Sequence, residues 1–138
     1  MKRIIYILIL CISITALGQE NNTLTVEFEG IKTDEAKLFV ALYDSEISFL
    51  KKAVQGTVVT VNNGNATAVF NNLNPGIYAI SSFLDKNNNG KLDTNFMHIP
   101  KEPTAMSNNA KGSFGPPKFK DAKFSITDSH TKIKIKFK

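Results

Sequence analysis

The sequence predicts an all-β protein: a two-layer sandwich of seven short strands with one long ordered loop. Three observations predict this fold. Apolar residues alternate with polar residues over short runs, clusters of Asn, Gly and Pro separate these runs, and no stretch carries a sustained amphipathic helical pattern. The nearest approach to a helix is a single turn within residues 45–53.

The first four strands are predicted from alternation and turn signals. Residues 24–28 alternate apolar with polar side chains, which is typical of a strand with one buried face. Residues 37–43 are more continuously apolar and predict a central strand. Residues 57–61 and 66–70 flank the Asn/Gly cluster at residues 62–65. Because Asn and Gly tolerate positive φ, this cluster predicts a hairpin.

Three further strands follow. Residues 77–84 form the fifth, while residues 124–126 and 133–137 predict a final hairpin around residues 128–130. The tail TKIKIKFK alternates Lys with Ile and Phe, which predicts a strand with a buried apolar face and a solvated Lys face. The predicted core comprises Val26, Phe28, Val40, Leu42, Val69, Ile80, Phe124, Ile126, Ile133 and Ile135.

The N-terminus has the pattern of a cleavable signal peptide. Lys2 and Arg3 precede an apolar run, and the small residues Ala16 and Gly18 predict cleavage between Gly18 and Gln19. The apolar run is shorter than the roughly 20 residues that a membrane-spanning helix needs. We therefore expect residues 1–18 to be a signal peptide and the protein to be exported to the periplasm or the extracellular space. Residues 19–138 are expected to form a single β-sandwich domain without a membrane span.

Composition restricts the chemistry of the processed chain. Cys11 is the one cysteine, and its removal with the signal peptide excludes disulfides, thiolate metal sites and thiol nucleophiles. A lipid anchor on Cys11 is disfavoured because the bulky Leu10 precedes it. The full chain has a net charge of +5, but its one arginine, Arg3, is also removed. Since Arg dominates base recognition, we do not expect nucleic-acid binding.

The sharpest motif is a calcium-type loop at residues 85–93, with the sequence DKNNNGKLD. Oxygen-bearing side chains occupy loop positions 1, 3, 5 and 9, Gly occupies position 6, and position 7 can offer its carbonyl. Phe96 stands at position 12, where an EF-hand has a bidentate Glu, so affinity in the range of about 0.1–1 mM is expected. The alternative is an ordinary Asn/Gly turn. The predicted ligands are Asp85, Asn87, Asn89, Asp93 and the Lys91 carbonyl.

The rest of the long segment, residues 85–121, is rich in Asn, Gly, Pro and Lys but also carries apolar residues that flexible linkers lack. We therefore expect an ordered loop packed over one end or face of the sandwich. If calcium does not order it, Phe96, Phe114 and Phe119 alone must hold it. The predicted ligand-contacting residues of this segment are His98, Ser107, Asn108, Asn109 and Phe114.

Two resemblances extend these predictions. The turn and strand at residues 73–80, Leu-x-Pro-Gly-x-Tyr-x-Ile, resemble those of prealbumin-like sandwiches, which include repeat domains of bacterial adhesins, so the resemblance implies an immunoglobulin-like or prealbumin-like sandwich. The Tyr78 hydroxyl is expected to reach a backbone group. A longer resemblance, to domain-of-unknown-function family 2141, implies a small exported β-sandwich and no particular activity. It rests on residues 85–96 together with Ile99, Pro100, Lys101, Glu102, Pro103, Ser107, Asn108, Asn109, Ala110, Gly112, Phe114, Gly115, Pro116, Pro117, Phe119 and Ala122.

Three functions are compatible with these patterns. The first is a non-enzymatic exported module, with a calcium-stabilised loop that presents a surface to a protein, a glycan or a small ligand. The second is a small hydrolase that uses His98 with Asp93 or Glu102. The third is a periplasmic carrier of a small ligand. A histidine paired with a carboxylate in a pocket would favour the hydrolase, and an exposed, solitary His98 would favour the module.

Overall fold

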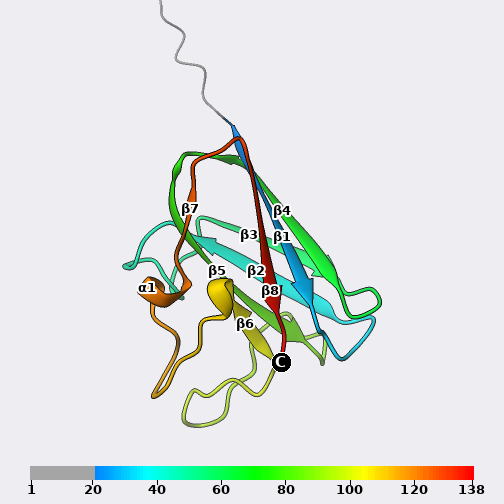
Figure 1. Ribbon diagram of the computed structural model, residues 1–138. Helices are drawn as coiled ribbons and strands as arrows, with labels where there is room; N and C mark the ends of the chain where they lie inside the picture. The colour runs from blue at the N-terminus through cyan, green and yellow to red at the C-terminus, as the bar shows by residue number, and fades with distance from the viewer. Residues whose placement is uncertain (1–20) are drawn as a thin grey trace, which may run out of the picture.

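The computed structural model describes residues 21–138, so the predicted signal peptide lies outside the described residues. The described chain is nearly all β, and its elements follow one another as shown in Figure 1. They are β1 (Asn22–Glu29), β2 (Lys37–Tyr43), β3 (Gln55–Thr60), β4 (Ala66–Leu73), β5 (Gly76–Asp85), β6 (Thr104–Met106), the 3-10 turn η1 (Ser107–Asn109), α1 (Phe119–Ala122), β7 (Phe124–Ile126) and β8 (His130–Lys136). Within residues 21–138, no helix has the length and apolarity to cross a bilayer.

The strands form two sheets that face each other across the main core. One sheet has three strands in the order β4-β1-β8, and the other has the order β3-β2-β5-β6, with β7 also pairing with β5. The first and last strands, β1 and β8, lie side by side and run parallel, while the other pairs are antiparallel. The two-layer all-β prediction is confirmed. The seven-strand layout is not, because β6 is an eighth strand within the segment that was predicted to be a loop.

Both predicted hairpins are wrong, although their strands exist. The Asn62–Asn65 bridge forms a tight turn, but β3 then pairs with β2 whereas β4 pairs with β1 in the other sheet. Likewise, β7 pairs with β5 and β8 pairs with β1. The β3–β4 and β7–β8 connections therefore each cross from one sheet to the other. This arrangement buries the apolar face of each strand against the opposite sheet.

Alternation in the strands builds the main core. In β1 every second residue is buried, including Leu24, Val26 and Phe28. The predicted core residues confirmed as buried are Val26, Phe28, Val40, Leu42, Ile80, Ile126 and Ile135, while Phe124 and Ile133 are partly buried and pack against the same cluster. Buried residues that the prediction omitted include Leu24, Ile31, Leu38, Val61, Phe70, Leu73, Leu84 and Phe137.

Val69 is the one predicted core residue on the wrong face. It is 47% exposed, because in β4 the inward positions are Ala66, Ala68 and Phe70. Val69 pairs with Thr25 on the outer face of the sheet. An error of one residue in the alternation of a strand places every side chain on the opposite face. The inward residue Ala68 is only weakly apolar, so the sequence did not show which residues of β4 face the core.

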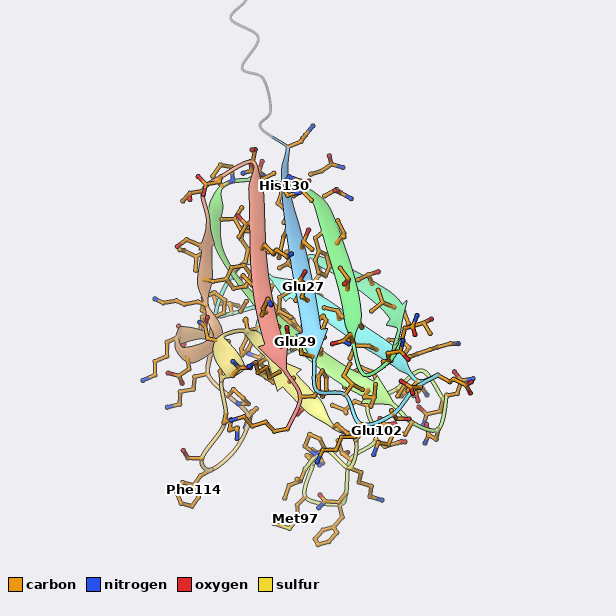
Figure 2. The ribbon with its side chains drawn as sticks, turned by 45° about the vertical axis from the view of Figure 1, so that its right-hand side comes forward. Glu27, Glu29, Met97, Glu102, Phe114 and His130 are labelled. Atoms are coloured by element: carbon orange, nitrogen blue, oxygen red, sulfur yellow. The ribbon has the colours of Figure 1, made fainter. Side chains whose placement is uncertain are left out.

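The lysine face of β8 points to solvent, as its alternation predicts. Lys132, Lys134 and Lys136 are exposed, while Ile135 lies in the core. On neighbouring β1, Glu27 pairs with Lys132 and Lys134, and Lys134 also approaches Glu29 at 3.2 Å. Figure 2 shows both glutamates on β1. These opposite charges therefore join the two parallel strands across the outer face.

A second, smaller core lies on the outer face of the five-stranded sheet. It contains Tyr43, Phe49, Ala79, Met106 and Ala122, with Phe119 packed against it. The rings of Phe49 and Phe119 meet edge to face at 5.7 Å between centroids. The later part of the long segment is therefore packed over a sheet face, as predicted. Residues 45–53 supply Phe49 to this core as a series of turns rather than a helix.

Candidate functional site

Asp85 ends β5 and anchors the predicted calcium loop. Its side chain is only 2% exposed, and its two carboxylate oxygens accept hydrogen bonds from the backbone N–H groups of Asn89 (3.2 Å) and Gly90 (2.8 Å). Gly90 has a φ of +75°, a conformation that glycine adopts without steric cost. The loop therefore wraps around the Asp85 carboxylate, as the alternation of oxygen-bearing residues predicts.

The remaining predicted ligands lie on the outer part of the same loop. The Oδ1 atom of Asn87 accepts the Asn89 N–H at 3.2 Å, and the Oδ1 atom of Asn89 accepts the Lys91 N–H at 2.9 Å. The side-chain amides of Asn87 and Asn89 both donate to the Asp93 carboxylate. The structure therefore brings Asp93 back toward positions 3 and 5 of the loop.

Glu102 is the part of this site that the calcium motif did not identify. Its side chain is 7% exposed, with Oε1 accepting the Lys86 N–H at 2.9 Å and Oε2 accepting the Asp93 N–H at 3.1 Å. One carboxylate thus binds the first and last turns of the loop, and Figure 2 shows it at the base of the segment that carries Met97. Glu102 lies nine residues beyond Asp93, outside the spacing of the motif, so only tertiary structure could place it there.

The chemistry of these donors suits a hard cation, although the carboxylates alone do not make a site. Among residues 21–138, no three His, Cys, Asp or Glu side chains come close enough together to hold a metal ion. Calcium also accepts amide and backbone carbonyl oxygens, which Asn87, Asn89 and Lys91 carry.

His98 lies on the exposed loop beyond this site. It adopts a φ of +62°, and its backbone N–H donates to the Asn95 carbonyl at 3.0 Å. Within the described part of the chain, its ring makes no hydrogen bond or ion pair with Asp93 or Glu102. The arrangement that would favour a hydrolase is therefore not formed by these residues.

Ser107 is a structural residue rather than a ligand contact. It is fully buried, and its hydroxyl accepts the Ile80 N–H at 2.9 Å and donates to the Ala122 carbonyl. It thereby joins β5, η1 and α1 from inside the fold. The prediction that Ser107 lies on a ligand-contacting surface is wrong, because a small hydroxyl in a buried position satisfies backbone groups that would otherwise have no partner.

Asn108 and Asn109 also serve the fold. Both have positive φ, which Asn tolerates. The Asn108 amide donates to the carbonyls of Asp121 (3.3 Å) and Lys123 (2.8 Å), and Asn109 Oδ1 accepts the Lys136 N–H at 2.9 Å. These two side chains connect η1 to the turns around α1 and to β8. Both residues remain exposed, and only the Asn108 NH₂ group and the Asn109 Oδ1 atom make these bonds, so their predicted ligand contact stays a prediction.

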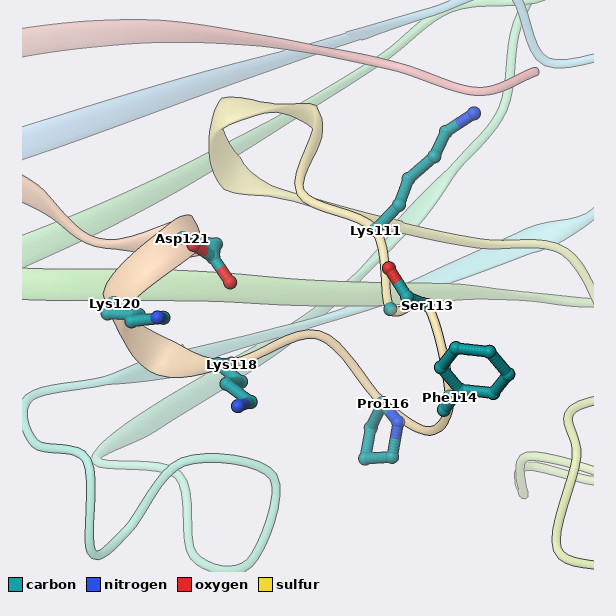
Figure 3. A pocket seen from close by; sticks show the side chains of 8 residues that line it. Lys111, Ser113, Phe114, Pro116, Lys118, Lys120 and Asp121 are labelled. Carbon is teal, nitrogen blue, oxygen red and sulfur yellow. The ribbon is translucent and has the colours of Figure 1, made fainter.

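Phe114, like His98, Asn108 and Asn109, is exposed to solvent. It stands at the tip of an exposed turn, where a Cβ on Gly112 would lie 1.7 Å from the Gly115 carbonyl oxygen. The turn borders an open depression of about 350 Å³, shown in Figure 3, whose lining is Lys111, Gly112, Ser113, Phe114, Pro116, Lys118, Lys120 and Asp121. A carrier would enclose its ligand in apolar surface, whereas this depression is shallow and bordered by lysines.

The chain is similar to one bacterial protein family and to one solved structure. No curated protein matches the chain. One similar solved structure is the tip fimbrial protein Mfa3 from Porphyromonas gingivalis with a C-terminal truncation, at 17% identity and a TM-score of 0.41. The match covers 83% of this chain and 48% of that one, so the chain spans about half the length of the fimbrial structure. The family described as an uncharacterized protein conserved in bacteria, DUF2141, matches residues 26–134. The chain therefore belongs to the DUF2141 family, which confirms the longer of the two resemblances.

Proposed function

We propose that this protein is an exported, non-enzymatic β module whose segment 85–121 presents a binding surface, and that calcium stabilises the loop at residues 85–93. The observation that carries the proposal is the organisation of this loop by carboxylates. Asp85 holds its centre, Asp93 faces its asparagines, and Glu102 binds its two ends.

A cation would relieve the main electrostatic cost of this arrangement. Asp85 is buried and Asp93 is partly buried, so two carboxylates share one short loop with little solvent around the first. Lys86 and Lys91 lie in the same loop, but neither forms an ion pair with these carboxylates in the described chain. Carboxylate oxygens have further lone pairs beyond those used by the N–H donors, so Asp85 can bind an ion without losing its backbone partners.

The non-enzymatic part of the proposal is supported by the site residues. His98 lacks a carboxylate partner among residues 21–138, and Ser107 is buried with its hydroxyl engaged by the backbone. Large apolar side chains are instead exposed at the tips of its loops. A contact surface uses such side chains directly, whereas a catalytic site needs paired polar groups in a sheltered position.

Thermal melting in calcium and in chelator tests the calcium part. An ion that binds only the folded state raises stability by RT ln(1 + [L]/Kd), about 2.7 kcal/mol at a hundredfold excess over Kd. We expect a higher Tm in 10 mM calcium than in EDTA, with magnesium substituting poorly because it requires a tighter octahedron. Equal melting temperatures in calcium and in chelator would reduce the loop to an ordinary Asn/Gly turn.

A further inference from the structure

Two loop tips of the long segment expose large apolar side chains at the same end of the molecule. Phe96 is 91% exposed and Phe114 is fully exposed, and Met97 and Ile99 are each more than half exposed. Figure 2 shows Met97 and Phe114 projecting together at the end opposite His130. We name these four residues, Phe96, Met97, Ile99 and Phe114, the loop-tip surface.

The loop tips do not depend on these apolar side chains for their shape. In the first tip, Asn95 Oδ1 accepts the backbone N–H groups of Met97 (2.9 Å) and Ile99 (3.0 Å), and the Lys101 N–H donates to the Asp93 carbonyl at 2.8 Å. In the second tip, the close approach of Gly112 to Gly115 admits no side chain. The expectation that Phe96 and Phe114 hold the segment in place is therefore wrong, and both are free for another contact.

The segment that carries the loop-tip surface is rich in exposed lysines. Residues 86–121 contain six lysines against three acidic residues, and the carboxylate of one of these, Glu102, is buried under two backbone N–H donors. The six lysines, all exposed, are Lys86, Lys91, Lys101, Lys111, Lys118 and Lys120. Figure 3 shows Lys118 and Lys120 at α1, across the depression from Phe114. This end of the protein thus combines apolar tips with a positive margin.

We propose that the loop-tip surface inserts into the interface of an anionic lipid membrane, with the surrounding lysines contacting lipid headgroups. This inference names the partner of the binding surface in the proposed function and rests on it. Proteins bind at a membrane interface when apolar side chains such as Phe and Ile reach the acyl boundary and Lys side chains lie at the level of the headgroups. Two protruding tips can enter a soft interface together.

A second copy or another protein fits this surface less well. Stable protein interfaces bury about 1,200–2,000 Å² in a closely packed patch, which separate convex tips do not provide. The positive margin would also repel the same margin on a second copy. An anionic bilayer complements both features at once, since it accepts isolated apolar side chains and attracts the lysines.

Single tryptophans test the insertion directly, because the chain contains no tryptophan. The protein is recovered after export by the expressing cell, so all variants share one N-terminus. Phe96→Trp and Phe114→Trp place the reporter on each tip, and Val69→Trp places it on the outer face of β4 as a matched control. Vesicles contain phosphatidylcholine with or without phosphatidylglycerol, and brominated lipid quenches any tryptophan that enters the bilayer.

With phosphatidylglycerol vesicles, the two tip reporters should shift to shorter emission wavelength and be quenched, and Val69→Trp should not. In co-sedimentation, Phe114→Ser should weaken vesicle binding about tenfold. Lys101→Gln should weaken it about fivefold, and Lys52→Gln, outside the segment, should not.

Three outcomes would overturn the proposal: no vesicle binding, equal quenching of all three reporters, or an emission shift that depends on protein concentration without vesicles. The last would identify a contact between copies. Melting curves keep this test separate from the proposed calcium site. If calcium raises the melting temperature but the protein does not bind vesicles, the lipid inference alone is overturned. If the protein binds vesicles but calcium does not change its melting temperature, the calcium proposal alone is overturned.

Discussion

The buried carboxylate of Glu102 accepts the backbone N–H of Asp93 at 3.1 Å and, through its other oxygen, the N–H of Lys86 at 2.9 Å. A side chain distant in sequence thus closes the loop that Asp85 opens. Glu102→Gln retains the shape but replaces one acceptor oxygen with an NH₂ group, which opposes a backbone donor. We expect the free energy of unfolding to fall by about 1–3 kcal/mol.

Urea denaturation measures this change, and Glu46→Gln is the matched control. Glu46 is exposed on the loop between β2 and β3, so its substitution should change stability by less than about 0.5 kcal/mol. An equal effect of both substitutions would show that the hydrogen bonds of Glu102 contribute no specific stability to the loop.

The calcium proposal predicts a graded series of variants. Asp85→Asn should abolish most of the calcium-dependent rise in Tm, because it removes the central charge while retaining an acceptor for the loop. Asp93→Ala should reduce that rise, and Lys91→Ala should leave it nearly unchanged, since only the Lys91 carbonyl is used. Each variant is compared with itself in chelator, which separates ion binding from any loss of intrinsic stability. A full calcium response in Asp85→Asn would contradict the assignment.

Ser107 should matter for stability and not for binding. Ser107→Ala leaves the Ile80 N–H and the Ala122 carbonyl without their hydroxyl partner in a fully buried position, so unfolding should become easier by about 1–3 kcal/mol. Ser113→Ala, on an exposed turn, is the control and should be nearly neutral. Unchanged stability in Ser107→Ala, as measured by urea denaturation, would reopen a ligand-contacting role.

The charge pairs between β1 and β8 predict a pH dependence. The hydrogen bond from Lys132 holds the pKa of Glu27 below its ordinary value of 4.5, and burial opposes this only in part. A lowered folded pKa stabilises the protein above pH 4.5, and this contribution is lost as pH falls through the folded value. The Tm difference between wild type and Glu27→Gln should therefore shrink in acid, and also in high salt because Glu27 is exposed to solvent screening. A difference that persists in acid would exclude the charge pair as its source.

The predicted signal peptide is tested by the mass of the exported protein. Cleavage after Gly18 should give an N-terminus at or within a few residues of Gln19. Substituting Ala16 by a bulky, charged residue should block this cleavage. Recovery of the uncleaved, soluble chain from the cytoplasm of its own cell type would contradict export.

The fold class and the local shape of the calcium-type loop could be predicted from the amino-acid sequence alone. Period-two alternation is a local property, so it located seven of the eight strands and the buried face of β1. Loop chemistry is also local: the spacing from Asp85 to Asp93 predicted a wrapped turn with glycine at its sharpest point. The Tyr78 hydroxyl donates to the Asn74 carbonyl at 2.8 Å, and the Pro-Gly turn before β5 predicted that this hydroxyl reaches a backbone group.

The pairing of the strands and the burial of polar side chains depend on contacts between distant segments, so the sequence did not reveal them. Strand pairing depends on burial against distant partners, so the parallel pairing of β1 with β8 replaced the predicted final hairpin. The same physics buried Ser107, because its hydroxyl satisfies backbone groups of distant segments that no local pattern reveals. Conversely, only the packed fold showed that Met97, next to the exposed Phe96 in the chain, lies with Phe114 at one end of the molecule.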